Sequence, residues 1–201
     1  EAKDSAWAVD QIVETLNEML TYHPRIRVAI EPKPNEPMDH TYIPTTGHAI
    51  ALAQRTVAPE RIGVNIESAH AILAGLDPSD EMGFALSFGK LWSVHLNDQN
   101  GPKFDQDKSF GSVDLRRAFN QVRILDRHGY GRKGESVGLD VKAMRTQKAG
   151  AATRHLSNSR TMFLRLLEIS RALDEAAVQS LIAERDYEAL DLLIMQALTG
   201  R

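Results

Sequence analysis

Residues 61–67 read Arg-Ile-Gly-Val-Asn-Ile-Glu, so branched apolar side chains alternate with small or polar ones. A two-residue period is typical of a β-strand, because successive side chains point to opposite faces. We predict three further strands, at residues 25–31, 91–97 and 137–142. Helical apolar spacing occupies residues 6–20, 47–57, 80–88 and 114–128, and continues from about residue 153 to the end. Strands that alternate with helices predict parallel βαβ units.

Two of the predicted helices carry a clear apolar stripe. The first helix follows Ser5, which we predict as its N-cap. Its stripe consists of Val9, Val13, Leu16 and Leu20. The helix at 114–128 is predicted to turn inward Leu115, Phe119, Val122 and Leu125.

The side-chain parity of the four strands distinguishes an open sheet from a barrel. In each strand one face combines a small residue with polar residues near the carboxyl end, and the other face is apolar. The polar faces consist of Ala29, Glu31 and Lys33; Gly63, Asn65 and Glu67; Ser93, His95 and Asn97; and Gly138, Asp140 and Lys142. Polar strand ends that converge on one point are expected inside a barrel, whose chemistry lies at the carboxyl rim. An open sheet would bind in one crevice between two strands. We therefore predict an α/β fold that forms part of a (β/α)₈ TIM barrel.

Four ligand-type side chains stand near the ends of the four strands: Glu31, Glu67, His95 and Asp140. A single carboxylate at such a position is more often an N-cap or an ion-pair partner than a metal ligand. Four groups in phase, however, would bring like charges into a partly dry cavity, which is unfavourable unless a cation neutralises them. Three carboxylates and one imidazole suit Mg²⁺, Mn²⁺ or Co²⁺. The sequence therefore predicts a divalent metal site.

A second cluster of ligand-type residues lies close by in the sequence. His70 follows Glu67 by three residues, and Asp105 and Asp107 are spaced to point the same way from the loop after the third strand. These residues suggest a second metal ion, with Glu67 as a bridge between the two. Purely structural roles stay open for these residues. His70 could be a hydrogen-bonded loop histidine, and Asp105 and Asp107 could be turn-forming residues.

Two lysines share the polar faces of their strands. Lys33 lies two residues beyond Glu31, and the prolines on either side of it stiffen the backbone that aims it. We predict that its ammonium enters the cavity, where it can stabilise negative charge on a carbonyl oxygen. Lys142 either does something similar or pairs with Asp105 or Asp107.

Composition excludes several classes of protein. Of 201 residues, 42% are hydrophobic and 25% charged, and the formal net charge of -3 gives no general case for a nucleic-acid or membrane partner. The basic stretch 101–160 is interpreted as solvated helix faces rather than as an anion or RNA surface. Because cysteine is absent, a metal must be bound by oxygen and imidazole. Without a signal-peptide pattern or an apolar run of about 18 residues, we expect a cytoplasmic protein.

Three segments resemble the xylose isomerase family. Residues 30–37, Ile-Glu-Pro-Lys-Pro-Asn-Glu-Pro, are similar to the strand that carries a metal ligand and a lysine in that family. Residues 63–67, Gly-Val-Asn-Ile-Glu, with Ala69-His70 and 74–76, Ala-Gly-Leu, resemble the next strand and loop. Residues 96–107, Leu-Asn-Asp-Gln-Asn-Gly-Pro-Lys-Phe-Asp-Gln-Asp, followed by Phe110-Gly111, resemble the third.

The resemblance implies a reaction and a set of roles. The first metal would be bound by Glu31, Glu67 and Asp140, and the second by Glu67, His70, Asp105 and Asp107. Lys33 would donate a hydrogen bond to the substrate carbonyl, and the implied catalytic residues are Lys33, His70 and Asp107. The implied reaction interconverts an aldose and its ketose by a metal-assisted 1,2-hydride shift, without an organic cofactor.

Two features depart from the family. His95 stands where the typical xylose enzyme has an aspartate and resembles the rhamnose isomerase type, so the identity of the sugar stays open. The resemblance implies a pentose or a 6-deoxyhexose, such as xylose or rhamnose. The family's ring-opening residues and aromatic pocket walls belong to the first four barrel strands, which this sequence lacks. We therefore expect the C-terminal half of a barrel over residues 1–152 and a helical extension over residues 153–201. Such a fragment is expected to be inactive in isolation.

Other interpretations of the same residues stay open. A sugar epimerase or a metal-dependent phosphodiesterase could use a similar barrel, and a non-catalytic half-barrel could bind metal as an assembly module. A half-barrel would have two unpaired sheet edges. We therefore expect a homo-oligomer or pairing with the missing N-terminal half, and a small sugar as the ligand.

Overall fold

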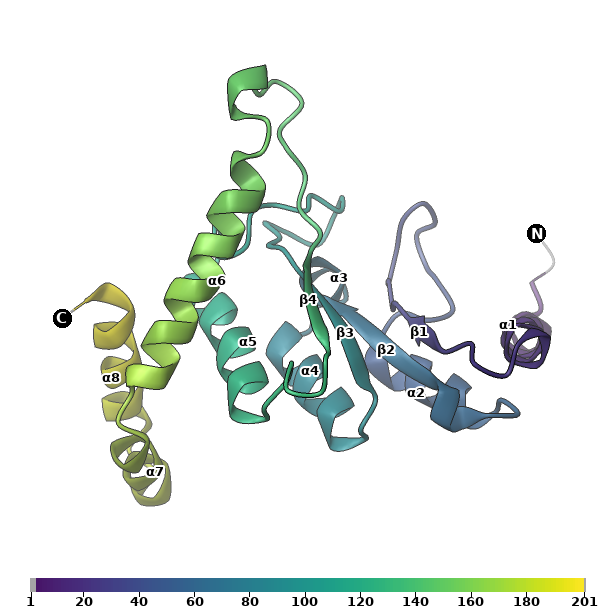
Figure 1. The fold of residues 1–201 in the computed structure, drawn as a ribbon, viewed down its shortest axis with the longest axis horizontal. Helices are drawn as coiled ribbons and strands as arrows, with labels where there is room; N and C mark the ends of the chain where they lie inside the picture. The colour runs from purple at the N-terminus through teal and green to yellow at the C-terminus, as the bar shows by residue number, and fades with distance from the viewer. Residues whose placement is uncertain (1–2, 201) are drawn as a thin grey trace.

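The computed structural model describes residues 3–200 and contains one four-stranded parallel sheet in the order β1-β2-β3-β4 (Figure 1). The strands are β1 (Val28–Ile30), β2 (Ile62–Glu67), β3 (Leu91–Leu96) and β4 (Ser136–Leu139). The α-helices are α1 (Ser5–Tyr22), α2 (Thr46–Gln54), α3 (Ser68–Leu73), α4 (Pro78–Ser87), α5 (Leu115–Arg127), α6 (Arg154–Ala172), α7 (Glu175–Glu184) and α8 (Tyr187–Thr199). Short 3₁₀ turns lie at Pro59–Arg61 and Ala149–Ala151. The predicted α/β class with four parallel strands is confirmed.

The two edge strands are shorter than predicted. β1 ends at Ile30, just before the segment with Pro32 and Pro34, whose nitrogens cannot donate hydrogen bonds to a sheet. β4 ends at Leu139, because the chain then turns toward the loop after β3, where the Lys142 amide donates to the carbonyl of Asp107 at 2.8 Å. In both cases the predicted site residues therefore lie just beyond the sheet rather than in it.

Three helical details also differ from the prediction. The short helix α3 was not predicted, since it follows β2 directly and has no separate turn signal. The N-cap of α1 is Asp4 rather than Ser5, because the Asp4 carboxylate accepts the Trp7 amide at 3.0 Å. Leu115, predicted to point inward, begins α5 and is 37% exposed, whereas Phe119, Val122 and Leu125 are buried as expected.

One hydrophobic core lies between the sheet and its helices. α2 packs on β2, α4 packs on both β2 and β3, and α5 lies between α4 and α6. Parity predicted eight apolar side chains for this face, and five of them are buried: Ile30, Val64, Ile66, Val94 and Leu96. The other three, Val28, Leu139 and Val141, are only partly buried because they belong to the edge strand β1 or lie at or just beyond the end of the edge strand β4. The opposite face of the sheet is more open, and the His95 side chain on it is 35% exposed.

An irregularity in β3 places a tryptophan on the open face. The β2–β3 register shifts between Val64 and Asn65, so that Leu91 pairs with Val64 and Ser93 pairs with Asn65. The intervening Trp92 turns its indole over Gly63, where an added Cβ would lie 2.1 Å from the ring. The Arg27 guanidinium stacks on the same indole, 3.8 Å from the ring centroid. Gly63 is therefore required for this packing, because a side chain at position 63 would overlap the Trp92 indole.

The C-terminal segment forms three helices rather than one long helix. α6 runs along α5, and α8 contacts both α6 and α7. Leu166 of α6 and Ile194 of α8 belong to the same buried cluster as the sheet residues. Asp174 and Asp186 cap the N-termini of α7 and α8, which explains the two interruptions. Among residues 3–200, no helix has the length and apolar character needed to cross a membrane.

Candidate metal centre

The predicted ligands gather at the carboxyl ends of the strands. Glu67 is the last residue of β2 and His95 lies one residue before the end of β3. Glu31 and Asp140 each follow directly after a strand, β1 and β4 respectively. Because all four strands are parallel, these ends lie at the same edge of the sheet.

The first group of ligands surrounds His95. Glu67, His95 and Asp140 each offer an atom within 4.8 Å of the others. His95 Nδ1 lies 3.3 Å from Glu31 Oε2 and 3.8 Å from Asp140 Oδ2. The Asn65 side chain lies between Glu31 and His95, with its Nδ2 3.1 Å from His95 Nδ1. The structure therefore brings together the four side chains predicted from strand parity.

The second group lies on the side of α3 and the loop after β3. Glu67, Asp105 and Asp107 offer atoms within 4.8 Å of one another, and so do Glu31, Glu67 and His70. His70 Nε2 lies 3.2 Å from Asp105 Oδ2 and 3.3 Å from Glu67 Oε1. Glu67 belongs to every one of these groups, which is the arrangement expected of a bridging carboxylate.

Burial makes Glu67 the most perturbed acid of the cluster. Its side chain is 2% exposed, and this burial raises the pKa of Glu67 to about 10. Asn97 donates a hydrogen bond that opposes the rise, whereas the negative charges of Asp105, Glu31 and Asp140 increase it. An isolated carboxylate in this position is therefore costly to ionise, and a cation that contacts it would remove that cost.

The two aspartates of the second group each pair with a lysine. Burial opposes ionisation of Asp105, but hydrogen bonds from His70 and Lys33 outweigh it and hold the pKa of Asp105 below its ordinary value. Lys33 Nζ lies 2.6 Å from Asp105 Oδ2. Burial raises the pKa of Asp107, although Lys142 Nζ contacts Asp107 Oδ2. The open choice for Lys142 is thus resolved in favour of pairing with Asp107.

Three buried polar atoms at this edge have no hydrogen-bond partner among the described residues: His70 Nδ1, Asp105 Oδ1 and Asn65 Oδ1. Unsatisfied buried groups are rare and point to a missing partner such as an ion. The donor set consists of carboxylate oxygens and imidazole nitrogens, which suits a hard or borderline divalent cation. The residues at this edge therefore fit the metal ions predicted from the sequence.

Sequence reasoning missed the amides that orient these ligands. Asn97 is 1% exposed, and its Nδ2 donates to Glu67 Oε1 and to Asp107 Oδ1, both at 2.9 Å. Its Oδ1 accepts the Ala69 amide at 2.7 Å, which fixes the start of α3. Gln99, equally buried, donates to the carbonyls of Gly101 and Phe104 and so shapes the loop that carries the aspartates. The polar parity of Asn97 was the only signal available in the sequence.

Replacing Asn97 by alanine is expected to weaken metal binding by about 10- to 100-fold, as is typical when an outer hydrogen-bond partner of metal ligands is removed. The physical reason is that Glu67 and Asp107 lose the donor that orients both of them. Calorimetric titration with Mn²⁺ measures the change. Asn158→Ala, at an exposed position on α6, is the matched control, and equal affinities in the two variants would contradict the role of Asn97.

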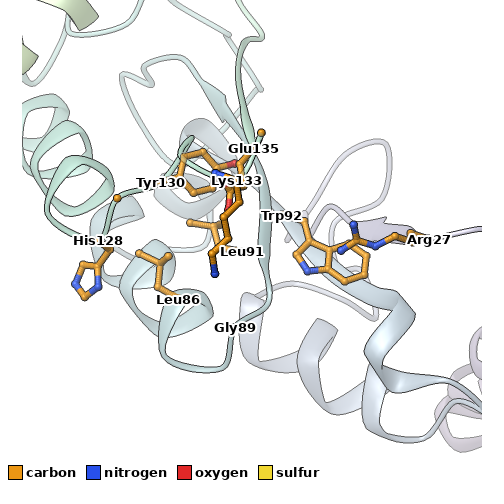
Figure 2. A pocket seen from close by; sticks show the side chains of 11 residues that line it. Arg27, Leu86, Gly89, Leu91, Trp92, His128, Tyr130, Lys133 and Glu135 are labelled. Atoms are coloured by element: carbon orange, nitrogen blue, oxygen red, sulfur yellow. The ribbon is translucent and has the colours of Figure 1, made fainter.

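A cavity at the opposite end of the strands is as large as the one beside Asp105 and Lys142. It has a volume of about 560 Å³ and is lined by residues that precede β1, β3 and β4 or begin β3, including Arg27, Trp92, Tyr130, Lys133 and Glu135 (Figure 2). Figure 2 shows the Arg27 and Trp92 side chains next to each other, apart from the Tyr130 and Lys133 side chains. No predicted metal ligand lines this cavity. In barrel enzymes this end serves stability rather than chemistry.

Comparisons with known proteins agree with this architecture. The family described as xylose isomerase-like TIM barrel matches residues 1–156. Xylose isomerase of Streptomyces lividans is 34% identical, over 95% of this chain and 54% of the relative. The chain therefore spans about half the length of this curated relative.

Two solved structures have a similar fold. The crystal structure of a D-tagatose 3-epimerase-like protein aligns with a TM-score of 0.64 at 17% identity, over 81% of this chain and 55% of that one. A xylose isomerase domain protein from Alicyclobacillus acidocaldarius subsp. acidocaldarius aligns with a TM-score of 0.58 at 15% identity, over 86% of this chain and 62% of that one. The family match, the 34% identity and the strand order lead to one conclusion: this chain belongs to the xylose isomerase-like TIM-barrel family.

Proposed function

We propose that the chain carries the metal-binding part of the active site of an aldose–ketose isomerase that acts on a pentose or 6-deoxyhexose, such as xylose or rhamnose. The observation that supports this most strongly is the presence of Glu67 in three potential metal-binding groups, with His95 and Asp140, with Asp105 and Asp107, and with Glu31 and His70. Such sharing fits two adjacent divalent ions better than one.

The proposed reaction is balanced within the sugar. A hydride moves from C2 to C1 of the open-chain aldose, and a proton moves from O2 to O1, so no external oxidant or reductant is required. Two divalent ions, Mn²⁺, Mg²⁺ or Co²⁺, would polarise the sugar oxygens when bound. Glu31, Glu67, His95 and Asp140 would hold the first ion. Glu67, His70, Asp105 and Asp107 would hold the second.

Lys33 is the proposed electrophilic residue. It follows β1, its side chain is 28% exposed, and its ammonium lies at the same edge as the ligand groups. A positive charge there stabilises the negative charge that develops on the carbonyl oxygen during the shift. His70 and Asp107 are the other proposed catalytic residues. His70 contacts Glu67 directly, and Asp107 is linked to Glu67 through the side chain of Asn97, which donates a hydrogen bond to each of the two carboxylates.

The proposal includes a partner for the open face of the sheet. β1 and β4 are the edges of the four-stranded sheet, and His95 on its open face is 35% exposed. Unpaired parallel edges favour association with further strands. We propose that a complementary half-barrel, or another copy in a homo-oligomer, covers this face and completes the sugar pocket.

An isotope experiment tests this function. It uses the polypeptide in the form that its host produces. The protein is loaded with Mn²⁺ and given xylose, rhamnose, arabinose or ribose deuterated at C2. The expected product is the matching ketose with deuterium retained at C1, because a hydride shift moves the label directly between the two carbons. Removing the metal with a chelator should abolish turnover. Loss of the label to solvent would contradict the hydride shift.

Giving the same protein a ketose as well as the aldoses separates the competing functions. A sugar epimerase, the activity named for the structural neighbour above, would convert one ketose into another and leave aldoses unchanged. A non-catalytic half-barrel would bind Mn²⁺ without forming any product. Either result would overturn the proposed isomerase.

A further inference from the structure

The two proposed ion sites differ in the cations that the protein itself supplies. Among residues 3–200, no lysine or arginine forms an ion pair with Glu31, Glu67 or Asp140. In the second group, by contrast, Lys33 pairs with Asp105 and Lys142 pairs with Asp107. Asp105 and Asp107 of the second site are therefore already paired with ammonium groups, whereas the shared Glu67 and the carboxylates of the first site are not.

Lys142 is held against Asp107 by its backbone as well as by its side chain. The Lys142 amide donates to the Asp107 carbonyl at 2.8 Å, and Lys142 Nζ contacts Asp107 Oδ2. Asp107 itself has a φ of 46°, in the left-handed region that non-glycine residues adopt at a cost. The backbone hydrogen bond therefore fixes both the strained aspartate and the start of the lysine side chain.

The two side chains differ sharply in exposure. The Asp107 side chain is 2% exposed, whereas that of Lys142 is 64% exposed. A lysine that is so accessible can swing into solvent at little cost, but the buried aspartate cannot follow it. The remaining Asp107 oxygen already accepts a hydrogen bond from Asn97 at 2.9 Å. An ion that binds Asp107 must therefore compete directly with the Lys142 ammonium.

We propose that Lys142 is an internal counter-ion that occupies Asp107 in the metal-free protein and lowers the affinity of the second metal site. This inference rests on the proposed two-metal function. Lys142 acts through Asp107 and is a positioning residue rather than a catalytic one. Binding of the second ion displaces its ammonium from Asp107, while the backbone hydrogen bond keeps the loop in place.

Calorimetric titration of the full chain with Mn²⁺ tests the proposal, with Lys142→Gln as the variant. The glutamine keeps the backbone hydrogen bond and removes the competing charge. The second of two binding events is expected to become about tenfold tighter, because a buried carboxylate left without its partner gains more from an incoming cation. The first event should stay unchanged, since Lys142 contacts none of its ligands directly.

Two control variants separate direct competition from general electrostatics. Lys108→Gln removes the same charge from the same rim, but Lys108 forms no ion pair in the part of the chain that the structure describes, so both affinities should stay within about twofold. Lys142→Arg keeps the charge and should keep the wild-type affinity. Circular dichroism without metal confirms that each variant folds.

The outcomes distinguish this inference from the function on which it rests. Two binding events with an unchanged or weaker second affinity in Lys142→Gln would overturn the counter-ion role and leave the two-metal site intact. An equal gain in the affinity for the second ion in Lys108→Gln would also overturn the counter-ion role, because the effect would then come from net charge. Binding of only one ion by the wild-type protein would overturn the two-metal function itself.

Discussion

Replacing Glu67 by glutamine is expected to weaken binding of both metal ions together, by about 100-fold or more for each, because ligand charge largely sets affinity in oxygen-rich sites. Glu67 contributes an atom to each of the ligand groups, and a neutral amide cannot neutralise two cations. Titration with Mn²⁺ should therefore lose both binding events. Weakening of only one event would contradict the bridging role.

The same substitution should not unfold the metal-free protein. Burial raises the pKa of Glu67 to about 10, so its neutral form is favoured near neutral pH, and glutamine resembles that form. The melting temperature of the metal-free variant is therefore expected to be equal to, or slightly above, that of the unaltered protein. Glu60→Gln, at an exposed position just before the other end of β2, is the matched control for metal binding.

Replacing Lys33 by methionine is expected to reduce isomerisation by about 1,000-fold, a typical loss when a charge-stabilising group is removed from a developing oxyanion. Methionine has a similar length but no charge and no hydrogen-bond donor. Binding of Mn²⁺ should persist, because the substitution removes a competitor for Asp105 rather than a ligand. Steady-state kinetics and calorimetry on the same preparation measure both effects.

Lys103→Met is the matched control for this second substitution. Lys103 is exposed in the loop that carries the candidate aspartates, and its side chain makes no ion pair or hydrogen bond in the described part of the chain. Its turnover should equal that of the unaltered protein. Full turnover in Lys33→Met would refute the electrophilic role, and loss of metal binding would show that Lys33 instead supports the site.

Much of the fold could be predicted because strand parity carries real information about burial. Val64, Ile66, Val94 and Leu96 are buried as the period of two requires. What could not be predicted depends on contacts between distant segments. α3 begins where the Asn97 side chain accepts the Ala69 amide, 28 residues away, and β4 ends because the Lys142 amide bonds to the Asp107 loop.

The candidate site divides in the same way. Parity correctly placed Glu31, Glu67, His95 and Asp140 at one edge, because the ends of parallel strands meet there. The positions of Asp105 and Asp107 depend on a loop held by Gln99 and by the backbone pairing of Asp98 with Lys108. No periodic pattern describes such a loop. The metal-binding and catalytic roles of all these residues stay predictions until ions and sugars are tested.

The position of Trp92 gives the chain an internal optical reporter. Its indole rests on Gly63 under the Arg27 guanidinium, on the face that a complementary half-barrel would cover. The only other tryptophan, Trp7, is 62% exposed on α1 and can be replaced by phenylalanine. The fluorescence of the remaining indole would then report binding of the proposed complementary half-barrel in real time, without any attached dye.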